Sequence, residues 1–485
     1  MRDLIELVSD GLSSDFFQMN YNDFIKTTID SIPEAKYLHE EANESAEGVA
    51  SEKLKLFHGH SMTNEEIRAF SALVCFKDVV VGDEKAYENF TQCQHNLIPK
   101  KPVLSKESFF EIGNYVRSKL TNPEDCAAAI WSILCNDLGK VKSIENSFNN
   151  QHPDVLIGHD AILAEVLKEN AESFSAFNAL PKKQQQQIIA GYTSGCDISQ
   201  LEQLELPVIA LNKLTSLDKE TLDLYILHSI FDVAGAAAHF NSNGSFTMHQ
   251  ETWNFFNATQ ACLGTLSTTS IEDVYKQYLA YRGECVGIPL TTPESVAQIR
   301  IAGLARFGSP ERGGILQAAW DTLSPEVKET LINEFNAHGG QGQRAIFIGY
   351  GVSILLNAIG AKQKEFKEAT VEQRKELTRQ GLVIGLTNLA TAFSIARQIL
   401  HERGDTSNEI FVAECDQIAR ALNKNPDASI GMNWRIIAQN HRRVDFAFSP
   451  KPSNALTMSQ MGLLAQPISS NAFSLTDEQS LKFSK

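Results

Sequence analysis

Apolar residues recur three and four positions apart along most of the chain, with polar residues between them. This spacing is typical of amphipathic helices. It predicts helices over residues 64–76, 106–120, 122–138, 159–170, 182–192, 219–240, 271–281, 292–305, 311–321, 324–337, 345–359, 371–399 and 408–423. A β-branched run at 78–81 supports at most one isolated strand. The sequence therefore predicts an all-α protein.

Changes in this pattern divide the chain into four parts. Residues 1–53 combine short amphipathic helices with an acidic linker, and residues 54–266 form a first helical domain. Residues 271–448 form a second helical module. Residues 449–485 are rich in Ser and Pro and show weak periodicity, which predicts a flexible tail.

The composition limits the possible partners and compartments. A formal net charge of −16 excludes a general basic surface for a nucleic-acid duplex. The acidic N-terminus lacks the apolar core of a secretory signal, so we expect a cytoplasmic protein. The most apolar window, residues 345–361, is shorter than the ~20 residues that a membrane span needs and predicts a buried core helix. The eight cysteines show no paired or zinc-finger spacing, so we expect scattered thiols and no disulfide scaffold.

The most informative motif follows a helix rich in small apolar residues. That helix runs into Asn136-Asp137-Leu138-Gly139-Lys140. A glycine just past a helix lets the chain turn, so these polar side chains are expected at the end of a buried element. Asn and Asp also commonly end helices and cap turns, so the motif alone is compatible with a structural role.

Two later segments carry further histidines and aspartates. The segment QHPDVLIGHDAIL contains His152 and His159. On the next long helix, His228 and Asp232 are four residues apart and His239 is seven further on, so all three are expected on one face. Imidazole combined with carboxylate suits first-row divalent metals such as Mn, Fe, Co, Ni or Zn.

The first motif resembles the signature of the HD-domain phosphohydrolase superfamily, in which a small-residue helix runs into His-Asp-hydrophobic-Gly-Lys. In this chain CNDLGKV occupies that place. Asn136 stands where the family has His, whereas Asp137, Gly139 and Lys140 match the family pattern. Each motif is weak alone, but their order fits over roughly 110 to 180 residues.

The later segments extend this resemblance. His159 lies in a stretch similar to the one that supplies a further family histidine, and Asp232 lies on a helix similar to the one with the closing aspartate. The first family histidine has two possible positions. One is His60, just ahead of a helix that carries Arg68, which requires an insertion before Asp137. The other is the helix 108–120, which has no histidine, so the site would have lost a ligand.

The resemblance implies an HD-like helical core that hydrolyses a phosphoester or phosphodiester in a nucleotide, phosphorylated small molecule or conjugate. It implies one or two divalent metals (Mn, Fe, Co, Ni or Zn) and a metal-bound hydroxide that attacks phosphorus. The implied metal ligands are Asp137, His159, Asp232 and His228. His60 or His152 would complete the site, Asn136 would take the place of a ligand, and Lys140 would stabilise the developing charge.

Asn136 leaves two alternatives open, because an amide is a weak ligand beside imidazole and cannot accept a proton. The first is metal-free acid and base catalysis by His60, Asp137 and His159. The helical layout resembles HD-related phosphodiesterase domains of secreted bacterial effectors, in which such chemistry is known. The second is a non-catalytic protein that binds a protein partner through an HD-like frame. If the site is catalytic, we expect alanine at Asp137 to abolish turnover without unfolding the protein.

Overall fold

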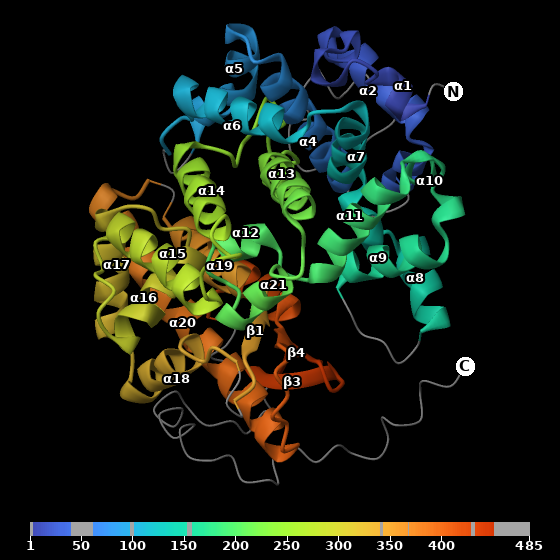
Figure 1. The fold of residues 1–485 in the computed structure, drawn as a ribbon. Helices are drawn as coiled ribbons and strands as arrows, with labels where there is room; N and C mark the ends of the chain where they lie inside the picture. Colours follow the sequence, from blue (N-terminus) through green and yellow to red (C-terminus); the bar gives the residue numbers. More distant parts are fainter. Residues whose placement is uncertain are drawn as a thin grey trace. The chain divides into compact units, whose positions relative to one another are not determined.

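The computed structural model describes residues 3–39, 62–97, 101–152, 158–339, 343–366, 368–427 and 432–450. Helices dominate these ranges, which confirms the predicted all-α class, with one small sheet in addition (Figure 1). Contacts divide the chain into two compact units. The first comprises residues 1–314, 335–347 and 405–411, and the second comprises 315–334, 348–404 and 412–485. The predicted boundary near residues 266–271 lies inside the first unit.

The first unit begins with short helices and continues with the longer helices of its core. Its elements up to residue 140 are α1 (Leu4–Leu7), α2 (Tyr21–Ser31), α4 (Asn64–Val81), α5 (Glu84–Thr91), α6 (Lys106–Lys119), α7 (Pro123–Cys135) and the 3-10 helix η5 (Asn136–Lys140). The helices that follow are α8 (Lys142–Gln151), α9 (His159–Glu169), α10 (Ser175–Ala179), α11 (Lys182–Ser194), α12 (Ile198–Glu202), α13 (Lys219–Gly235), α14 (Gln250–Leu263), α15 (Ile271–Val286) and α16 (Pro293–Leu304). Helix α17 (Pro310–Asp321) is divided between the units, with residues 310–314 in the first and 315–321 in the second.

Residues 78–81, which could have formed an isolated strand, are helical instead, because α4 runs without a break to Val81. A capping box between Thr63 and Glu66 satisfies the backbone N–H groups of these two residues at its start. Gly82, in the left-handed conformation, ends it. Val79 and Val80 are buried where α4 packs on its neighbours, and this packing outweighs their preference for strands.

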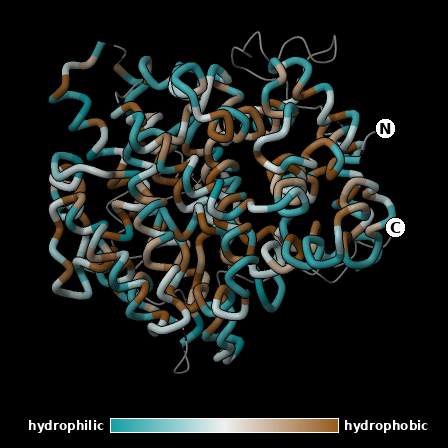
Figure 2. Tube along the Cα trace, turned by 45° about the horizontal axis from the view of Figure 1, so that its top comes forward, coloured by the Kyte–Doolittle hydropathy of each residue, from teal (hydrophilic) through white to brown (hydrophobic). Residues whose placement is uncertain are grey.

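The core of the first unit lies where α4, α7, α11 and α13 pack together. Trp131 on α7 is fully buried, and its indole N–H donates to Glu34. Figure 2 shows brown hydrophobic and teal hydrophilic residues alternating along the helices, as their amphipathic sequences require. This packing matters for the site, because α4, η5 and α13 carry its charged residues.

The second unit combines long helices with most of the small sheet. Its elements are α18 (Pro325–Phe335), β1 (Ile346–Gly349), α19 (Gly351–Lys364), α20 (Val371–Glu402), β2 (Phe411–Glu414), α21 (Asp416–Lys424), β3 (Met432–Gln439) and β4 (Arg443–Pro450). The strand order is β1-β2-β4-β3. Strand β2 pairs with β4 in parallel, and β3 pairs with β4 antiparallel with a register shift at Ile436–Ala438.

The strands correct two predicted helices, 345–359 and 408–423. Each range begins as a strand of four residues, β1 or β2, and only then becomes a helix, α19 or α21. The apolar runs AIFIG and IFVAE are so short that periodicity cannot distinguish a buried strand from a helical turn. The predicted tail, 449–485, lies outside the described residues beyond Pro450.

Helix α20 is the one helix in the described ranges whose length and composition would allow it to cross a membrane. Of its most apolar window, 56% is buried inside the protein, where α20 packs on α19. That burial is the behaviour of a core helix. All eight cysteines lie in the described residues, and none of them is disulfide-bonded there.

Candidate functional site

Charged residues from four elements of the first unit meet at one place. These residues are Glu65 and Arg68 on α4, Asn136, Asp137 and Lys140 on η5, His159 and Asp160 on α9, and Asp232 on α13. Most lie at the end of an element: Glu65 is in the first turn of α4, and His159 is the first residue of α9. We call this set the charged cluster. It brings together five of the residues singled out in the sequence: Asn136, Asp137, Lys140, His159 and Asp232.

Asp137 is the centre of the charged cluster. Its Oδ1 lies 2.7 Å from Nζ of Lys140 and 3.6 Å from Nε2 of His159. Its side chain is only 9% exposed. Burial alone would raise the pKa of Asp137, but the positive charges of Lys140 and Arg68 outweigh it and hold the pKa below its usual range. Asp137 therefore stays ionised at neutral pH and serves as the counter-ion of the neighbouring cations.

Glu65 behaves in the opposite way. Burial raises the pKa of Glu65 to about 7, and the nearby charge of Asp137 adds to the increase, although Lys140, 3.8 Å away, opposes it. Its other partner is Arg68, whose guanidinium donates to Glu65 at 2.9 Å. Two neighbouring carboxyl groups with pKa values driven apart are a common basis for acid and base roles. Glu65 is thus poised to exchange a proton near neutral pH.

His159 is accessible to solvent, with 42% of its side chain exposed. Its Nε2 lies 3.1 Å from Oδ1 of Asp160. Burial would lower the pKa of His159, but the charge and hydrogen bond of Asp160 outweigh it and raise the pKa. His159 is thereby favoured in its protonated form, as a proton donor that solutes can reach.

Asn136 and Arg68 complete the connections. The Asn136 side-chain amide donates to Oδ1 of Asp232 at 2.9 Å. Burial would lower the pKa of Arg68, but the charges of Asp137, Glu65 and Asp232 raise it, so the guanidinium stays charged. Arg68 therefore interacts electrostatically with Glu65 and Asp137 and also with Asp232.

Two glycines permit the close approach that forms the charged cluster. A Cβ at Gly139 would lie 2.0 Å from the backbone carbonyl oxygen of His159, and one at Gly235 would lie 2.4 Å from that of Arg68. Any side chain at these positions would force backbone apart. Gly139 thus brings η5 against α9, and Gly235 brings α13 against α4.

Replacing Gly139 with alanine is expected to separate η5 from α9 and to destabilise the protein by about 1–3 kcal/mol, because main chain cannot yield as a flexible side chain would. Gly158→Ala is the matched control, since a Cβ there meets nothing within 4 Å. Because Gly158 is the N-cap residue of α9, the substitution Gly158→Ala is expected to lower the free energy of unfolding by at most about 1 kcal/mol. Thermal unfolding compares the two variants, and equal melting temperatures would show that the Gly139 contact does not position the site.

Three predicted site residues lie elsewhere. His152 ends α8, stacks on Phe148, and its Nε2 lies 3.4 Å from Glu169 at the far end of α9. His60 lies outside the described residues. His228 lies one turn before Asp232, as predicted, but its buried ring sits between Tyr192 and Tyr225.

The His228 ring is 8% exposed, and neither of its nitrogens has a hydrogen-bond partner in the described part of the chain. Helix α13 ends at Gly235, so His239 lies beyond it and the predicted shared face of His228, Asp232 and His239 is wrong. Asp232 is therefore the residue through which α13 contributes to the charged cluster.

Sequence reasoning missed Glu65 and Asp160 and noted Arg68 only as part of a helix. The sequence did contain one signal: Thr63-Asn64-Glu65-Glu66 is a helix-start pattern that places Glu65 and Arg68 on one side of the first turn. Nothing local in the sequence indicates that this turn packs beside Asp137, 72 positions later.

The donor set does not suit a divalent metal. Asn136 provides an amide in place of imidazole and uses its N–H₂ group on Asp232. The Asp137 carboxylate already pairs with Lys140 and is flanked by Arg68. Within the described ranges, no three His, Cys, Asp or Glu side chains are grouped as metal ligands. The fixed cations Lys140 and Arg68 thus lie beside the carboxylate that a metal would need. The predicted Mn, Fe, Co, Ni or Zn stays a prediction for metal analysis.

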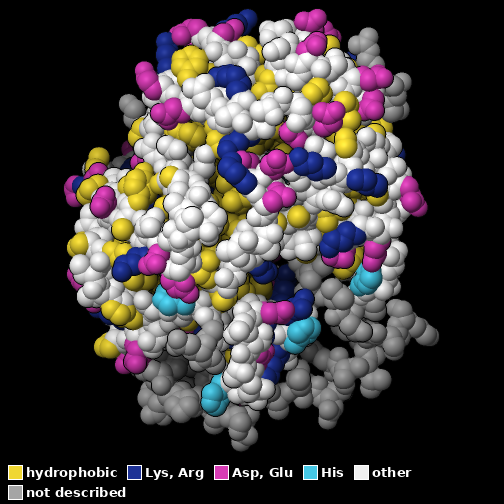
Figure 3. Space-filling model, in the orientation of Figure 1, with side chains coloured by type: hydrophobic (Ala, Val, Ile, Leu, Met, Phe, Trp, Pro, Cys, Tyr) yellow, Lys and Arg dark blue, Asp and Glu magenta, His cyan; other side chains and the backbone are white. Residues whose placement is uncertain are grey.

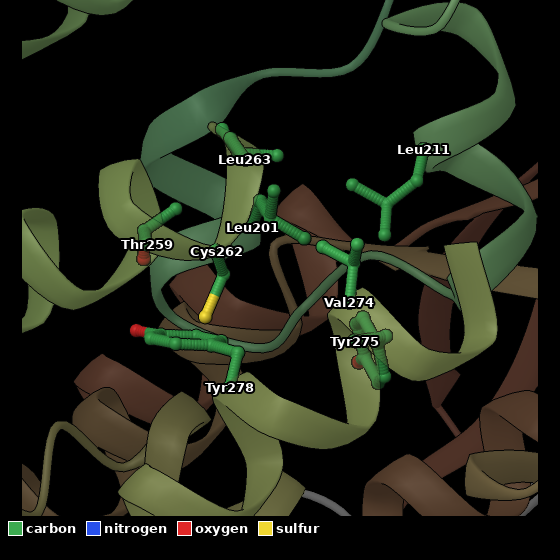
Figure 4. A pocket seen from close by; sticks show the side chains of 8 residues that line it. All are labelled: Leu201, Leu211, Thr259, Cys262, Leu263, Val274, Tyr275 and Tyr278. Atoms are coloured by element: carbon green, nitrogen blue, oxygen red, sulfur yellow. The ribbon is translucent and has the colours of Figure 1, made fainter. Parts of the chain in front are cut away.

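The first unit also contains a small apolar cavity between α12, α14 and α15. Figure 4 shows its lining, with the ring of Tyr278 next to Cys262 and Tyr275 next to Val274. Its volume of about 10 Å³ has room for about one water molecule. On the face that Figure 3 presents, acidic and basic side chains are interspersed. The charged cluster remains the site with the most evident chemistry.

Comparisons with known proteins give a family without an assigned activity. The profile described as "Family of unknown function (DUF6829)" matches residues 21–398. No curated protein and no solved structure matches the chain. The matched range contains every residue of the charged cluster and extends over more than half of the chain. The chain therefore belongs to the DUF6829 family.

Proposed function

We propose that the protein hydrolyses a phosphoester bond of a phosphorylated small molecule, nucleotide or phosphodiester conjugate, by acid and base catalysis at the charged cluster. One observation carries this proposal: Glu65, with a pKa near 7, lies beside Asp137, which stays ionised, and beside the fixed cation Lys140. A group that changes protonation near neutral pH is suited to proton transfer. The resemblance of the motifs around Asn136, His159 and Asp232 to HD-domain phosphohydrolases supports the same reaction class.

The fixed cations stabilise negative charge on the phosphoryl group. Lys140 pairs with Asp137 at 2.7 Å, and Arg68 interacts with Asp137 electrostatically. The pKa of each cation is held above its ordinary value because neighbouring carboxylates outweigh the effect of burial. Both therefore remain charged at any physiological pH. Preorganised cations beside a phosphoryl oxygen lower the energy of its transition state.

Glu65 and His159 carry the proton steps. The Glu65 carboxylate accepts a proton from water as the water oxygen bonds to phosphorus. The bond between phosphorus and the leaving oxygen breaks, and protonated His159 donates a ring proton to that oxygen. The products are an alcohol and a phosphate with one more hydroxyl group. Glu65 then returns its proton to solvent, and His159 takes one up.

This mechanism is expected to survive metal removal. Wild-type protein treated with EDTA should hydrolyse bis(4-nitrophenyl) phosphate or 4-nitrophenyl phosphate at the untreated rate, because no step uses a metal. His159→Gln should lower the rate, since it removes the proton donor, but by less than the ~100-fold expected for an alkoxide leaving group, because 4-nitrophenolate leaves readily without a proton. Release of 4-nitrophenol measures both effects, and elemental analysis of untreated protein should find no stoichiometric metal.

Two results would contradict this proposal. Loss of activity in EDTA, together with stoichiometric Mn, Fe, Co, Ni or Zn that Asp137→Ala abolishes, would establish the metal-dependent alternative. If neither compound is hydrolysed, with or without added metal, the remaining alternative is a binding protein with an HD-like frame and a protein partner.

A further inference from the structure

Three cations come together at a second place in the first unit, beside the start of helix α14. They are Lys101, Arg306 and Arg312, and we call them the basic cluster. The Lys101 ammonium contacts the carboxylate of Glu251, and these two side chains are only 14% and 17% exposed. Nη1 of Arg312 donates to the backbone carbonyl oxygen of Arg306 at 3.4 Å. The basic cluster shares no residue with the charged cluster.

Two backbone contacts bring these residues to α14. A Cβ at Gly308 would lie 2.9 Å from the ring of Phe255 and 3.3 Å from Cδ of Glu251, so the segment 306–309 packs directly on the helix. From the other side, the backbone N–H of Gln250 donates to the carbonyl oxygen of Pro102 at 3.1 Å. The lysine and the two arginines are therefore held on one helix although they lie far apart in the sequence.

The basic cluster has an excess of positive charge. Among the residues that the structure describes, neither Arg306 nor Arg312 forms an ion pair with a carboxylate, and Nε of Arg306 donates to the neutral amide oxygen of Gln203 at 3.0 Å. Burial and the positive charges of Arg312 and Arg306 lower the pKa of Lys101, although Glu251 opposes the decrease. The cluster and Glu251 together carry three positive charges and one negative charge.

Three other titratable groups nearby do not cancel this excess. Burial lowers the pKa of His249 to about 4, and Lys101 adds to the decrease, so the ring is neutral at neutral pH. Burial raises the pKa of Glu202 to about 7 and that of Glu205 to about 8. Glu202 also lies 3.8 Å from the guanidinium of Arg282. The excess of positive charge therefore persists at neutral pH.

Arg306 also occupies a backbone conformation that favours glycine. Its φ is 55°, just past the end of α16, where its N–H donates to the carbonyl oxygen of Gly303 at 2.8 Å. A side chain in this left-handed region raises the energy of the backbone, and glycine is the usual residue there. Such local strain is often found where a side chain is needed for binding.

We propose that the basic cluster binds the phosphate group of a small phosphomonoester, at a site separate from the charged cluster. Guanidinium groups match the geometry of phosphate oxygens and can donate two parallel hydrogen bonds to them. A phosphomonoester carries close to two negative charges at neutral pH, which matches the excess of positive charge. In a protein with a net charge of −16, a dianion needs such a local group of cations to bind. This proposal goes beyond the proposed function and does not depend on it.

Isothermal titration calorimetry with inorganic phosphate at neutral pH tests this proposal, with nitrate at equal ionic strength as the monoanion for comparison. Wild type is expected to bind phosphate and not nitrate. Arg312→Gln should weaken phosphate binding by about tenfold or more, because it removes a charge-assisted contact. Arg379→Gln is the matched control, since Arg379 lies on α20, pairs with Glu376 and is 28% exposed. It should leave the phosphate affinity unchanged.

Arg306→Gly separates binding from structure. It removes one cation and relieves the left-handed backbone, so it should weaken phosphate binding by about tenfold or more while raising the melting temperature of the ligand-free protein. Tyr350→Gly is the backbone control, because Tyr350 has a φ of 61° and lies on the other unit. It should leave the phosphate affinity unchanged. A lower melting temperature of Arg306→Gly with unchanged affinity would mean that Arg306 acts only through Gln203, and would overturn the proposal.

Three further results would overturn the proposal. The first is no phosphate binding, or equal affinity for nitrate. The second is binding that is lost in Lys140→Met but kept in both arginine variants, which would place the phosphate at the charged cluster and would support the proposed function instead. The third is sedimentation with phosphatidylcholine vesicles that contain phosphatidic acid, without binding of inorganic phosphate, which would assign the cluster to a membrane lipid. Failure of the proposed function would appear in the hydrolysis assay and not in this titration.

Discussion

Glu65→Gln is expected to lower the rate of phosphoester hydrolysis by about 100-fold or more, because the amide cannot accept a proton from water. The wild-type rate should rise with pH through about 7 as Glu65 loses its proton, and loss of the His159 proton should lower it. The residual activity of the variant should lack the rise near pH 7. A pH–rate profile of both proteins measures this difference.

The same substitution is expected to stabilise the folded protein above pH 7. Folding raises the pKa of Glu65, so the folded state favours the protonated carboxyl and loses stability as the pH rises through about 7. Glutamine reproduces the neutral form at every pH. At pH 8, the free energy of unfolding of Glu65→Gln should therefore exceed that of wild type by an amount on the order of 2 kcal/mol. The variant should accordingly have the higher melting temperature. The difference should disappear as the pH falls toward the ordinary value for Glu.

Glu84→Gln provides the control, because Glu84 lies on the neighbouring helix α5 with 61% of its side chain exposed. It should change neither the pH–rate profile nor the melting temperature. A variant Glu65→Gln that keeps the wild-type rate and its rise near pH 7 would remove Glu65 from the mechanism. The opposite signs expected for activity and stability distinguish a functional carboxyl from a structural one.

Asp137→Ala is expected to reduce the free energy of unfolding by about 3–5 kcal/mol, which differs from the sequence-based expectation of lost turnover without unfolding. The structure gives the reason. Asp137 is nearly buried and is the shared counter-ion of Lys140, Arg68 and His159, so its removal leaves like charges facing each other. Urea unfolding measures the loss.

Lys140→Met is the matched comparison for Asp137→Ala. It removes one cation but leaves Asp137 with Arg68 and His159, so we expect a smaller loss of stability, about 1–2 kcal/mol. Similar losses in the two variants would mean that Asp137 and Lys140 act only as an isolated pair. Under the proposed mechanism both variants should be inactive, since one removes the anchor of the cations and the other removes a cation proposed to stabilise the phosphoryl group.

The sequence predicts the helical class and much of the charged cluster. Helical periodicity defines α7, α9 and α13, and the ordered motifs indicate that Asn136, Asp137, His159 and Asp232 belong together. Periodicity shows only which face of a helix is apolar, however, and not which helices meet. Glu65 could not be predicted for this reason, because its proximity to Asp137 depends on how α4 packs in the core.

His228 and His152 show that sequence spacing can also predict site residues that packing places elsewhere. His228 has the spacing of a ligand, yet packing between two tyrosines places it in the core rather than among the charged residues. His152 is close in sequence to His159 but faces the other end of α9. Strands β1 and β2 are a separate difficulty, since each extends over only four residues and a short apolar run in a strand looks like an apolar turn of a helix.

The two glycine contacts have a consequence for how this family can diversify. At Gly139 and Gly235 main chain lies against main chain, so the frame of the site is set by backbone shape and not by the charged side chains it carries. Residues of the charged cluster other than the shared counter-ion Asp137 can therefore be exchanged while the helices stay in place. Relatives that keep both glycines but differ at Glu65, Asn136 or His159 are expected to share the architecture and differ in chemistry. Those two glycines are accordingly better markers of the fold than any charged residue around them.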